Sequence, residues 1–291
     1  MNGTVKLSLV EEWVLPWDKV HTPYLKMWRI IYVSWLGMAV TLGIPGNLLV
    51  ITSILSFKPL RKLPHAFVIN LAIFDMGVMC MNVLSITGAV LGEAFYTHTI
   101  CELSGTICMI ACFGSLWSIM AIAVNRYVFI TNTGLYNRVY TVKGTIIAIA
   151  TIWVCTVLID LPNMSFIGYG SHGFAYYALH CGFGLVVDWW YNVFFYTVFS
   201  FLIPVVVTAF CYVNIWIAAT GKGKKLAKLS ESRKREQKQL VKSLIIIFCC
   251  FVITWSPLSV LIFQMGIWPS TTVSFGSIFK NSFSLEFSNQ T

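Results

Sequence analysis

The triplet Asn125-Arg126-Tyr127 stands at the end of a long apolar stretch and carries a guanidinium group. Arg126 lies 25 residues after Cys101. At ~1.5 Å per residue, a helix of that length rises ~37 Å, more than the ~30 Å hydrocarbon core of a bilayer. The spacing therefore predicts that Cys101 and Arg126 lie at opposite faces of a membrane.

A second chemical group, the carboxylate of Asp75, falls in the middle of another apolar stretch. A carboxylate at that depth costs about 2.5–3.5 kcal/mol or more unless it is paired or solvated, so it indicates a functional role. Asn47 and Ser115 could supply further oxygens to a bound Na⁺. The alternative is a protonated Asp75 that hydrogen-bonds to its neighbours.

The composition is that of a membrane protein. Hydrophobic residues make up 57% of the 291 residues and charged residues 11%, with a mean hydropathy of +0.77. The net charge of +9 is concentrated between apolar segments, in Lys58–Lys62, Arg126–Lys143 and Lys222–Lys242. This is the positive-inside bias of cytoplasmic loops and argues against nucleic-acid binding.

Six segments are long and apolar enough to span a membrane. They are Ile30–Phe57, Ala66–Leu91, Leu103–Phe129, Gly144–Ile167, Tyr191–Ala219 and Leu240–Ile267. We therefore predict an all-α membrane bundle over residues 30–267. Residues 1–29 form an extracellular N-terminus with a glycosylation sequon at Asn2, and residues 268–291 form a tail that does not span. Neither a nucleophile–base pair, nor a metal cluster, nor a phosphate-binding loop supports an enzyme.

Two of the nine cysteines are expected to pair. Seven fall within apolar segments, whereas Cys101 and Cys181 fall at a non-basic, extracellular face. They are the natural disulfide partners in an oxidising compartment.

Proline interrupts three of the spans, at Pro162, Pro204 and Pro257, and each proline removes a backbone hydrogen bond and can kink its helix. Pro257 follows Phe251 and Trp255, which places an indole beside a hinge.

These features together resemble the rhodopsin-like G-protein-coupled receptors, across residues 28–267. The matching motifs are Gly46-Asn47, Leu71-Ala72-x-x-Asp75, Cys101, Asn125-Arg126-Tyr127, Trp153, Pro204 followed by Tyr212, and Phe251-x-x-x-Trp255-x-Pro257. The resemblance implies a multi-pass protein of the plasma membrane in which Arg126 engages a heterotrimeric G protein and Tyr212 swings towards it on activation. It also implies that Trp255 forms the floor of the ligand pocket and that Cys101–Cys181 pins a loop above it.

Within that family, three stretches resemble melatonin receptors and the insect moody and trapped-in-endoderm receptors. They are Asn125-Arg126-Tyr127, Leu161-Pro162-Asn163 and the segment from Phe201 to Trp216. Asn125 stands where most relatives carry Asp, so it offers Arg126 only a neutral hydrogen bond, which is weaker by about half. We expect elevated basal coupling.

The resemblance places the ligand pocket at Cys108, Met109, Asn163, Phe183, Ser200 and Trp255. A protonated amine finds no counter-ion at Cys108, so a small neutral or lipid-like ligand is expected. Ser200 and Leu185 depart from the melatonin-receptor pattern, and Asn163 could equally cap a helix end. His98, His172 and His180 are interpreted as solvated loop residues, and no metal site or cofactor is expected beyond the allosteric Na⁺.

The family's seventh helix has no counterpart before Thr291, so the expected fold is a seven-transmembrane bundle truncated to six spans. Two interpretations remain open. The chain is part of a working receptor, or it is a six-span isoform that does not signal and instead binds or retains full-length receptors. Further expected partners are membrane lipids, which the Lys222–Lys242 run could contact, and a second receptor in a dimer.

Overall fold

The computed structural model describes residues 18, 23–92, 95, 97–163, 172–175, 180–183, 192–220, 242, 245–246, 248–250 and 252–253. Its long helices are α2 (Pro23–Ser56), α3 (Leu63–Leu91), α4 (His98–Thr131), α6 (Val142–Asp160) and α8 (Ile203–Thr220), the last preceded by a π-helical segment η5 (Asn192–Leu202). The shorter elements are η2 (Lys58–Leu60), α5 (Thr133–Val139), η4 (Leu161–Asn163), β1 (His172–Ala175) and β2 (His180–Phe183).

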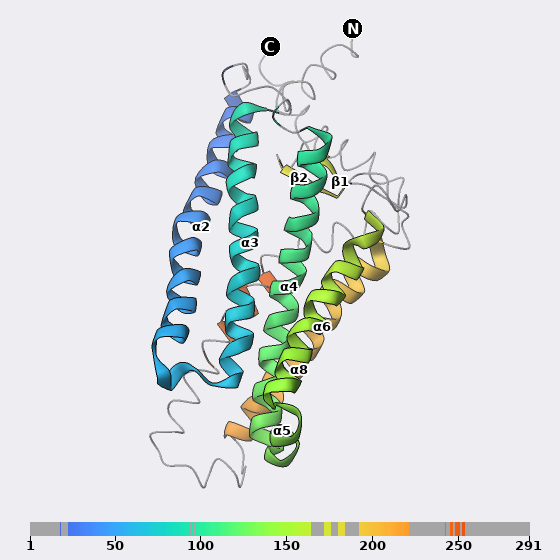
Figure 1. Ribbon diagram of the computed structural model, residues 1–291. Helices are drawn as coiled ribbons and strands as arrows, with labels where there is room; N and C mark the ends of the chain where they lie inside the picture. Colours follow the sequence, from blue (N-terminus) through green and yellow to red (C-terminus); the bar gives the residue numbers. More distant parts are fainter. Residues whose placement is uncertain are drawn as a thin grey trace.

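Five helices of the described residues are long and apolar enough to cross a membrane (Figure 1), which confirms the predicted class of helical membrane bundle. The first three begin three to seven residues earlier than predicted, as α4 shows at His98. Its cap explains the difference, because the Thr97 side chain accepts a hydrogen bond from the Ile100 amide at 3.3 Å. Caps of this kind extend a helix beyond its apolar window into the polar flank.

The predicted fourth span is too long at its C-terminal end. We expected it to continue through Pro162 to residue 167, but α6 ends at Asp160 and the chain passes into the 3₁₀ turn η4. Pro162 has no backbone N–H and its ring clashes with the carbonyl four residues earlier, so the α-helical ladder stops here instead of continuing through a kink.

The fifth span agrees in extent with the prediction but changes its winding. The chain is π-helical through Leu202 and α-helical from Ile203, with buried Pro204 at the second position of α8. Proline has no backbone N–H, so the start of a new helical ladder accommodates it without loss. The predicted effect of Pro204 on backbone geometry therefore appears as this change of helix type.

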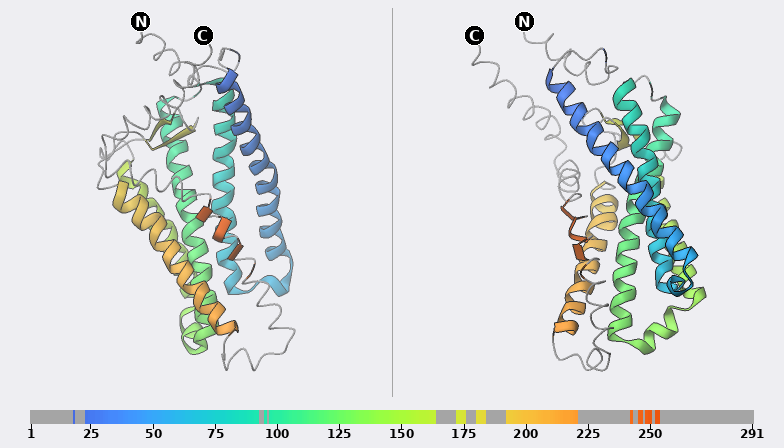
Figure 2. Two further views of the ribbon diagram at one scale, coloured as in Figure 1. Left: turned by 180° about the vertical axis from the view of Figure 1, so that it is seen from behind. Right: turned by 90° about the vertical axis from the view of Figure 1, so that its left-hand side faces the viewer.

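Helix α4 forms the centre of the described bundle, between α3 on one side and α6 and α8 on the other (Figures 1 and 2). A polar network joins three of these helices. The Trp153 indole donates to Asn70 Oδ1 at 2.9 Å, and Asn70 Nδ2 donates to Ser118 Oγ at 2.8 Å. Because buried Asn70 and Ser118 are both paired in this network, it fixes the rotation of α3, α4 and α6 about their axes.

The one departure from an all-helical fold among the described residues is the antiparallel hairpin β1–β2, which pairs His172 with Phe183 and Phe174 with Cys181. It lies at the end of α4 that carries His98 (Figure 1). Several predicted features fall outside the described residues: Asn2, Phe251, Trp255, Pro257 and the tail 268–291.

Candidate functional site

Arg126 lies near the end of α4, half-buried, beside two phenol groups. Its charge interacts with the side chains of Tyr136 in α5 and Tyr212 in α8. No carboxylate of the described residues pairs with Arg126, since the two ion pairs found there join other residues. Among the described residues, the groups whose charge interaction with Arg126 is resolved are therefore phenols and not carboxylates.

Asn125, which was expected to accept a neutral hydrogen bond from Arg126 through its Oδ1, is buried next to Arg126 in α4. Its side chain is 2% exposed, and Nδ2 has no hydrogen-bond partner among the described residues. The hydroxyl of Tyr212 is likewise buried and without such a partner there. Unpaired buried donors are uncommon and costly. Asn125 Nδ2 and the Tyr212 hydroxyl would therefore be stabilised by any conformation that gives them acceptors.

Apolar packing surrounds these polar groups. Ala123 of α4 forms a buried cluster with Cys211, Tyr212 and Ile215 of α8. Tyr212 also meets the ring of Phe248 edge-on, with centroids 6.0 Å apart. Because Phe248 belongs to the predicted sixth span, the Tyr212 ring joins the fifth and sixth spans at the end where Arg126 lies.

The short helix α5 contributes an aromatic cluster that the sequence analysis missed. Tyr136 stacks on Tyr140 with centroids 5.0 Å apart, and Tyr140 meets Phe67 of α3 edge-on at 6.2 Å. Burial, and to a lesser extent Tyr136, raises the pKa of Tyr140 to about 12, so this phenol stays neutral. The sequence did contain a signal for this cluster, because residues four apart, such as Tyr136 and Tyr140, are neighbours on a helix.

Asp75 and Ser115 meet in the middle of the bundle, as the sequence suggested. Ser115 Oγ donates to Asp75 Oδ1 at 2.6 Å, and the two residues belong to α3 and α4. The Asn47 amide turns to its own helix and donates to the Gly43 carbonyl at 3.0 Å. The structure thus joins two of the three predicted sodium ligands directly.

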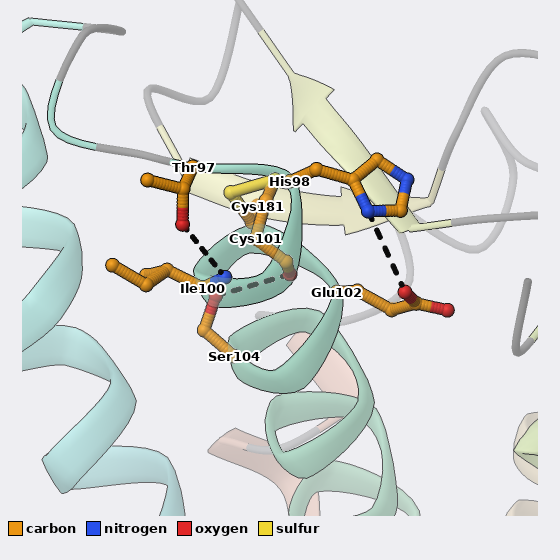
Figure 3. Close-up of a disulfide and its surroundings, with 7 residues drawn as sticks. All are labelled: Thr97, His98, Ile100, Cys101, Glu102, Ser104 and Cys181. Carbon is orange, nitrogen blue, oxygen red and sulfur yellow. Dashed lines mark hydrogen bonds and ion pairs between the residues drawn. A yellow bond between two sulfur atoms is a disulfide. The ribbon is translucent and has the colours of Figure 1, made fainter.

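The hairpin is attached to α4 by a disulfide between Cys101 and Cys181, with Cα atoms 5.1 Å apart. Figure 3 shows the disulfide at the first turns of α4, beside the Thr97 cap and the exposed contact of His98 with Glu102, whose atoms are 3.8 Å apart. The other seven cysteines carry free thiols.

His172 is not the solvated loop residue that we expected. Its side chain is fully buried, and Nε2 lies 3.1 Å from Oδ2 of Asp160, which is also fully buried. A Cβ added to Gly105 would lie only 2.7 Å from His172 Cβ, so the imidazole rests directly on the backbone of α4. The hairpin brings this loop histidine into the bundle. Asp160, at the end of an apolar span, is a functional candidate that the sequence analysis missed.

The predicted pocket residues are only partly brought together. Cys108 is half-buried on α4, and buried Met109 packs against Phe113 and Ile159. Ser200 is buried in η5, which contacts both α4 and α6. The backbone of Asn163 follows α6 and that of Phe183 lies in β2, while their side chains and Trp255 lie outside the described residues.

The comparisons with known proteins agree with this architecture. The family "7 transmembrane receptor (rhodopsin family)" matches residues 46–285. Melatonin receptor type 1B-A of Danio rerio is 31% identical over 218 residues, which cover 74% of this chain and 75% of the receptor. Melatonin receptor type 1B of Homo sapiens is 32% identical over 223 residues, 74% of this chain and 59% of that receptor. Squid rhodopsin has the same fold, with a TM-score of 0.67 at 23% identity over 84% of this chain and 76% of its own.

Proposed function

The chain belongs to the rhodopsin family of seven-transmembrane receptors, and we propose that it transmits an extracellular small-molecule signal to a heterotrimeric G protein. As a member of that family it is a multi-pass protein of the plasma membrane. The observation that carries the proposal is the environment of Arg126. This half-buried cation interacts electrostatically with the phenols of Tyr136 and Tyr212, and no carboxylate pairs with it among the described residues.

A small neutral or lipid-like molecule is the ligand class that the described residues favour. Helix α4 has no acidic residue between Glu102 and Arg126. Asp160 at the last turn of α6 is a buried carboxylate, and it is already engaged by His172. An amine would therefore have to displace an existing charge-assisted contact, whereas a neutral ligand would not. The relatives named melatonin receptors support a ligand of this kind.

The exposed apolar surface of the described helices would contact membrane lipid. Large apolar side chains of the described helices are exposed there, among them Trp35, Leu42 and Leu49 of α2, with Leu42 70% exposed. In water such a belt would aggregate, and in a bilayer it matches the surrounding acyl chains.

The proposal is tested with the chain expressed in cells together with resonance-energy-transfer sensors for each class of G protein. Melatonin, related neutral indoles and a panel of lipids are the probes. We expect a G-protein response, ligand-free or stimulated, that Arg126→Ala abolishes while surface expression is retained. An equal sensor signal from the receptor, from Arg126→Ala and from cells without the chain would contradict G-protein coupling.

The Asp75–Ser115 pair supports a second part of the proposal, an allosteric Na⁺ in the middle of the bundle. The two oxygens meet at 2.6 Å in a half-buried site between α3 and α4. A carboxylate and a hydroxyl are hard oxygen donors of the kind that alkali cations prefer. The bound ion would offset the cost of a charged Asp75 inside the membrane.

A further inference from the structure

A buried pair of ionisable groups fastens the hairpin to the helical bundle. His172 belongs to β1, and its Nε2 lies 3.1 Å from Oδ2 of Asp160 at the last turn of α6. Both side chains are fully buried. The adjacent strand β2 is fastened to a different helix, through the Cys101–Cys181 disulfide to α4. The hairpin therefore has a covalent attachment on one strand and a polar attachment on the other.

Cys181 and His172, the two hairpin residues that make these attachments, both contact α4 on one face. Cys101, Gly105 and Cys108 are spaced by four and three residues, so they lie one above another along the helix. Cys101 holds the hairpin, and Gly105 accommodates the His172 ring, whose Cβ would lie 2.7 Å from any added Cβ. One turn deeper lies Cys108, a pocket candidate on the same helix. The hairpin thus lies on the extracellular side of Cys108 along this face of α4.

Because the His172–Asp160 pair is buried and polar, it favours two arrangements of the hairpin, one with the contact formed and one with it broken. A disulfide alone is a single pivot about which a short hairpin can turn. A second contact between buried groups removes that freedom, and separating it leaves each partner without its charge-assisted hydrogen bond. Water that reached the two separated groups would recover part of that cost, so an open hairpin would be hydrated.

We propose that His172 and Asp160 are positioning residues that form a latch, which closes the β1–β2 hairpin over the ligand site and limits exchange between that site and the extracellular medium. The proposal rests on the proposed receptor function, because it describes the regulation of the same pocket. It assigns a role to a histidine and a carboxylate that lie outside the predicted pocket.

The test measures how fast a thiol beneath the hairpin reacts from outside. Cells that express the full chain are treated with the membrane-impermeant cation 2-(trimethylammonium)ethyl methanethiosulfonate. Modification of surface receptor is followed by mass spectrometry of the Cys108 peptide, with Cys108→Ser as the background. His172→Ala and Asp160→Ala should each raise the modification rate by at least about tenfold, the factor that one charge-assisted hydrogen bond contributes to an equilibrium.

A matched control is present in the same region. His98 and Glu102 form a histidine–carboxylate contact at 3.8 Å, but the His98 side chain is 75% exposed and lies outside the hairpin. His98→Ala should leave the rate of Cys108 modification unchanged. An equal increase in His98→Ala would show that loosening of the extracellular surface, and not the latch, controls access.

The double variant His172→Ala/Asp160→Ala separates a latch from two independent structural effects. Because the latch is the contact that the two residues share, the double variant should react no faster than either single variant. Multiplied effects, or no effect in any variant, would overturn the proposal. If the alanine variants do not reach the surface, Asp160→Asn serves in their place, because it keeps the size of the side chain and should give a smaller increase. The readout uses neither ligand nor G protein, so a failure of the proposed function would not alter it.

Discussion

Ser115 of α4 donates a 2.6 Å hydrogen bond to the carboxylate of Asp75 in α3. The contact brings together two residues that are 40 positions apart, and among the described residues it is the hydrogen bond found for the Asp75 carboxylate, which can accept more than one. The same pair occupies the middle of the bundle, between the hairpin end and the end that carries Arg126. A ligand bound there could therefore influence both ends.

The first prediction concerns Na⁺ at this pair. Asp75→Asn removes the charge that would hold the ion, so replacement of sodium by choline in the medium should no longer change ligand-free G-protein activation. Ser115→Ala should weaken the sodium effect without abolishing it. The measurement is sensor output against sodium concentration. A sodium response in Asp75→Asn as large as in the parent receptor would remove Asp75 from the site.

The second prediction concerns Asn125. Asn125→Asp introduces a carboxylate beside Arg126, whose charge is unpaired among the described residues, and should lower ligand-free signalling. An ion pair that adds about 1 kcal/mol to the inactive state shifts the equilibrium roughly fivefold. Asn137→Asp makes the same chemical change at an exposed position of α5 and should have little effect. Unchanged ligand-free output in Asn125→Asp would mean that Asn125 does not set basal activity.

The third prediction tests the close approach of α4 to α3. A Cβ at Gly114 would lie 2.2 Å from the ring of Phe74, which is itself stacked on Trp153 with centroids 4.2 Å apart. Gly114→Ala should therefore cost about 1–3 kcal/mol through overpacking, a fall of several degrees in the Tm of solubilised receptor. Gly37→Ala has nothing within 4 Å and should leave the Tm unchanged or raise it. Equal Tm values for the two variants would contradict the packing.

The fourth prediction isolates the hydrogen bond of Trp153. Trp153→Phe keeps an aromatic ring against Phe74 but leaves Asn70 Oδ1, which accepts the 2.9 Å bond, without its donor. The expected loss is about 1–3 kcal/mol of unfolding free energy. Trp35→Phe, on the exposed surface of α2, is the control and should lose little. Thermal unfolding in one detergent compares the two, and a larger loss for Trp35→Phe would refute the assignment.

The fifth prediction concerns the disulfide. Cys101→Ser frees the hairpin from α4 and should cost about 2–4 kcal/mol, seen as reduced surface expression. Cys181→Ser and the double variant should behave alike, because each breaks the same bond. Cys80→Ser, at an exposed free thiol, should be neutral. Normal surface expression of Cys101→Ser would show that the hairpin folds without its covalent attachment.

Much of the architecture could be predicted from local sequence properties. Apolar length defines the spans, and the positions of Cys101 and Cys181 at a non-basic face identify the disulfide, because both are direct consequences of the bilayer. Helix ends were less predictable. The end of α6 at Asp160 depends on Pro162 together with the turn that follows it, and the start of α4 depends on the Thr97 cap.

The site divides in the same way. The sequence by itself determined that Asp75 is out of place in an apolar span and that Arg126 stands at the end of one, because a charge deep in a bilayer is costly unless it is paired or solvated. Only the tertiary structure decided what those groups meet: Ser115 for Asp75, and the phenols of Tyr136 and Tyr212 for Arg126. The pairing of His172 with Asp160 was equally beyond local inference. A loop histidine becomes a buried partner only when a disulfide-anchored hairpin folds back onto the end of another helix, and that is a property of the assembled chain.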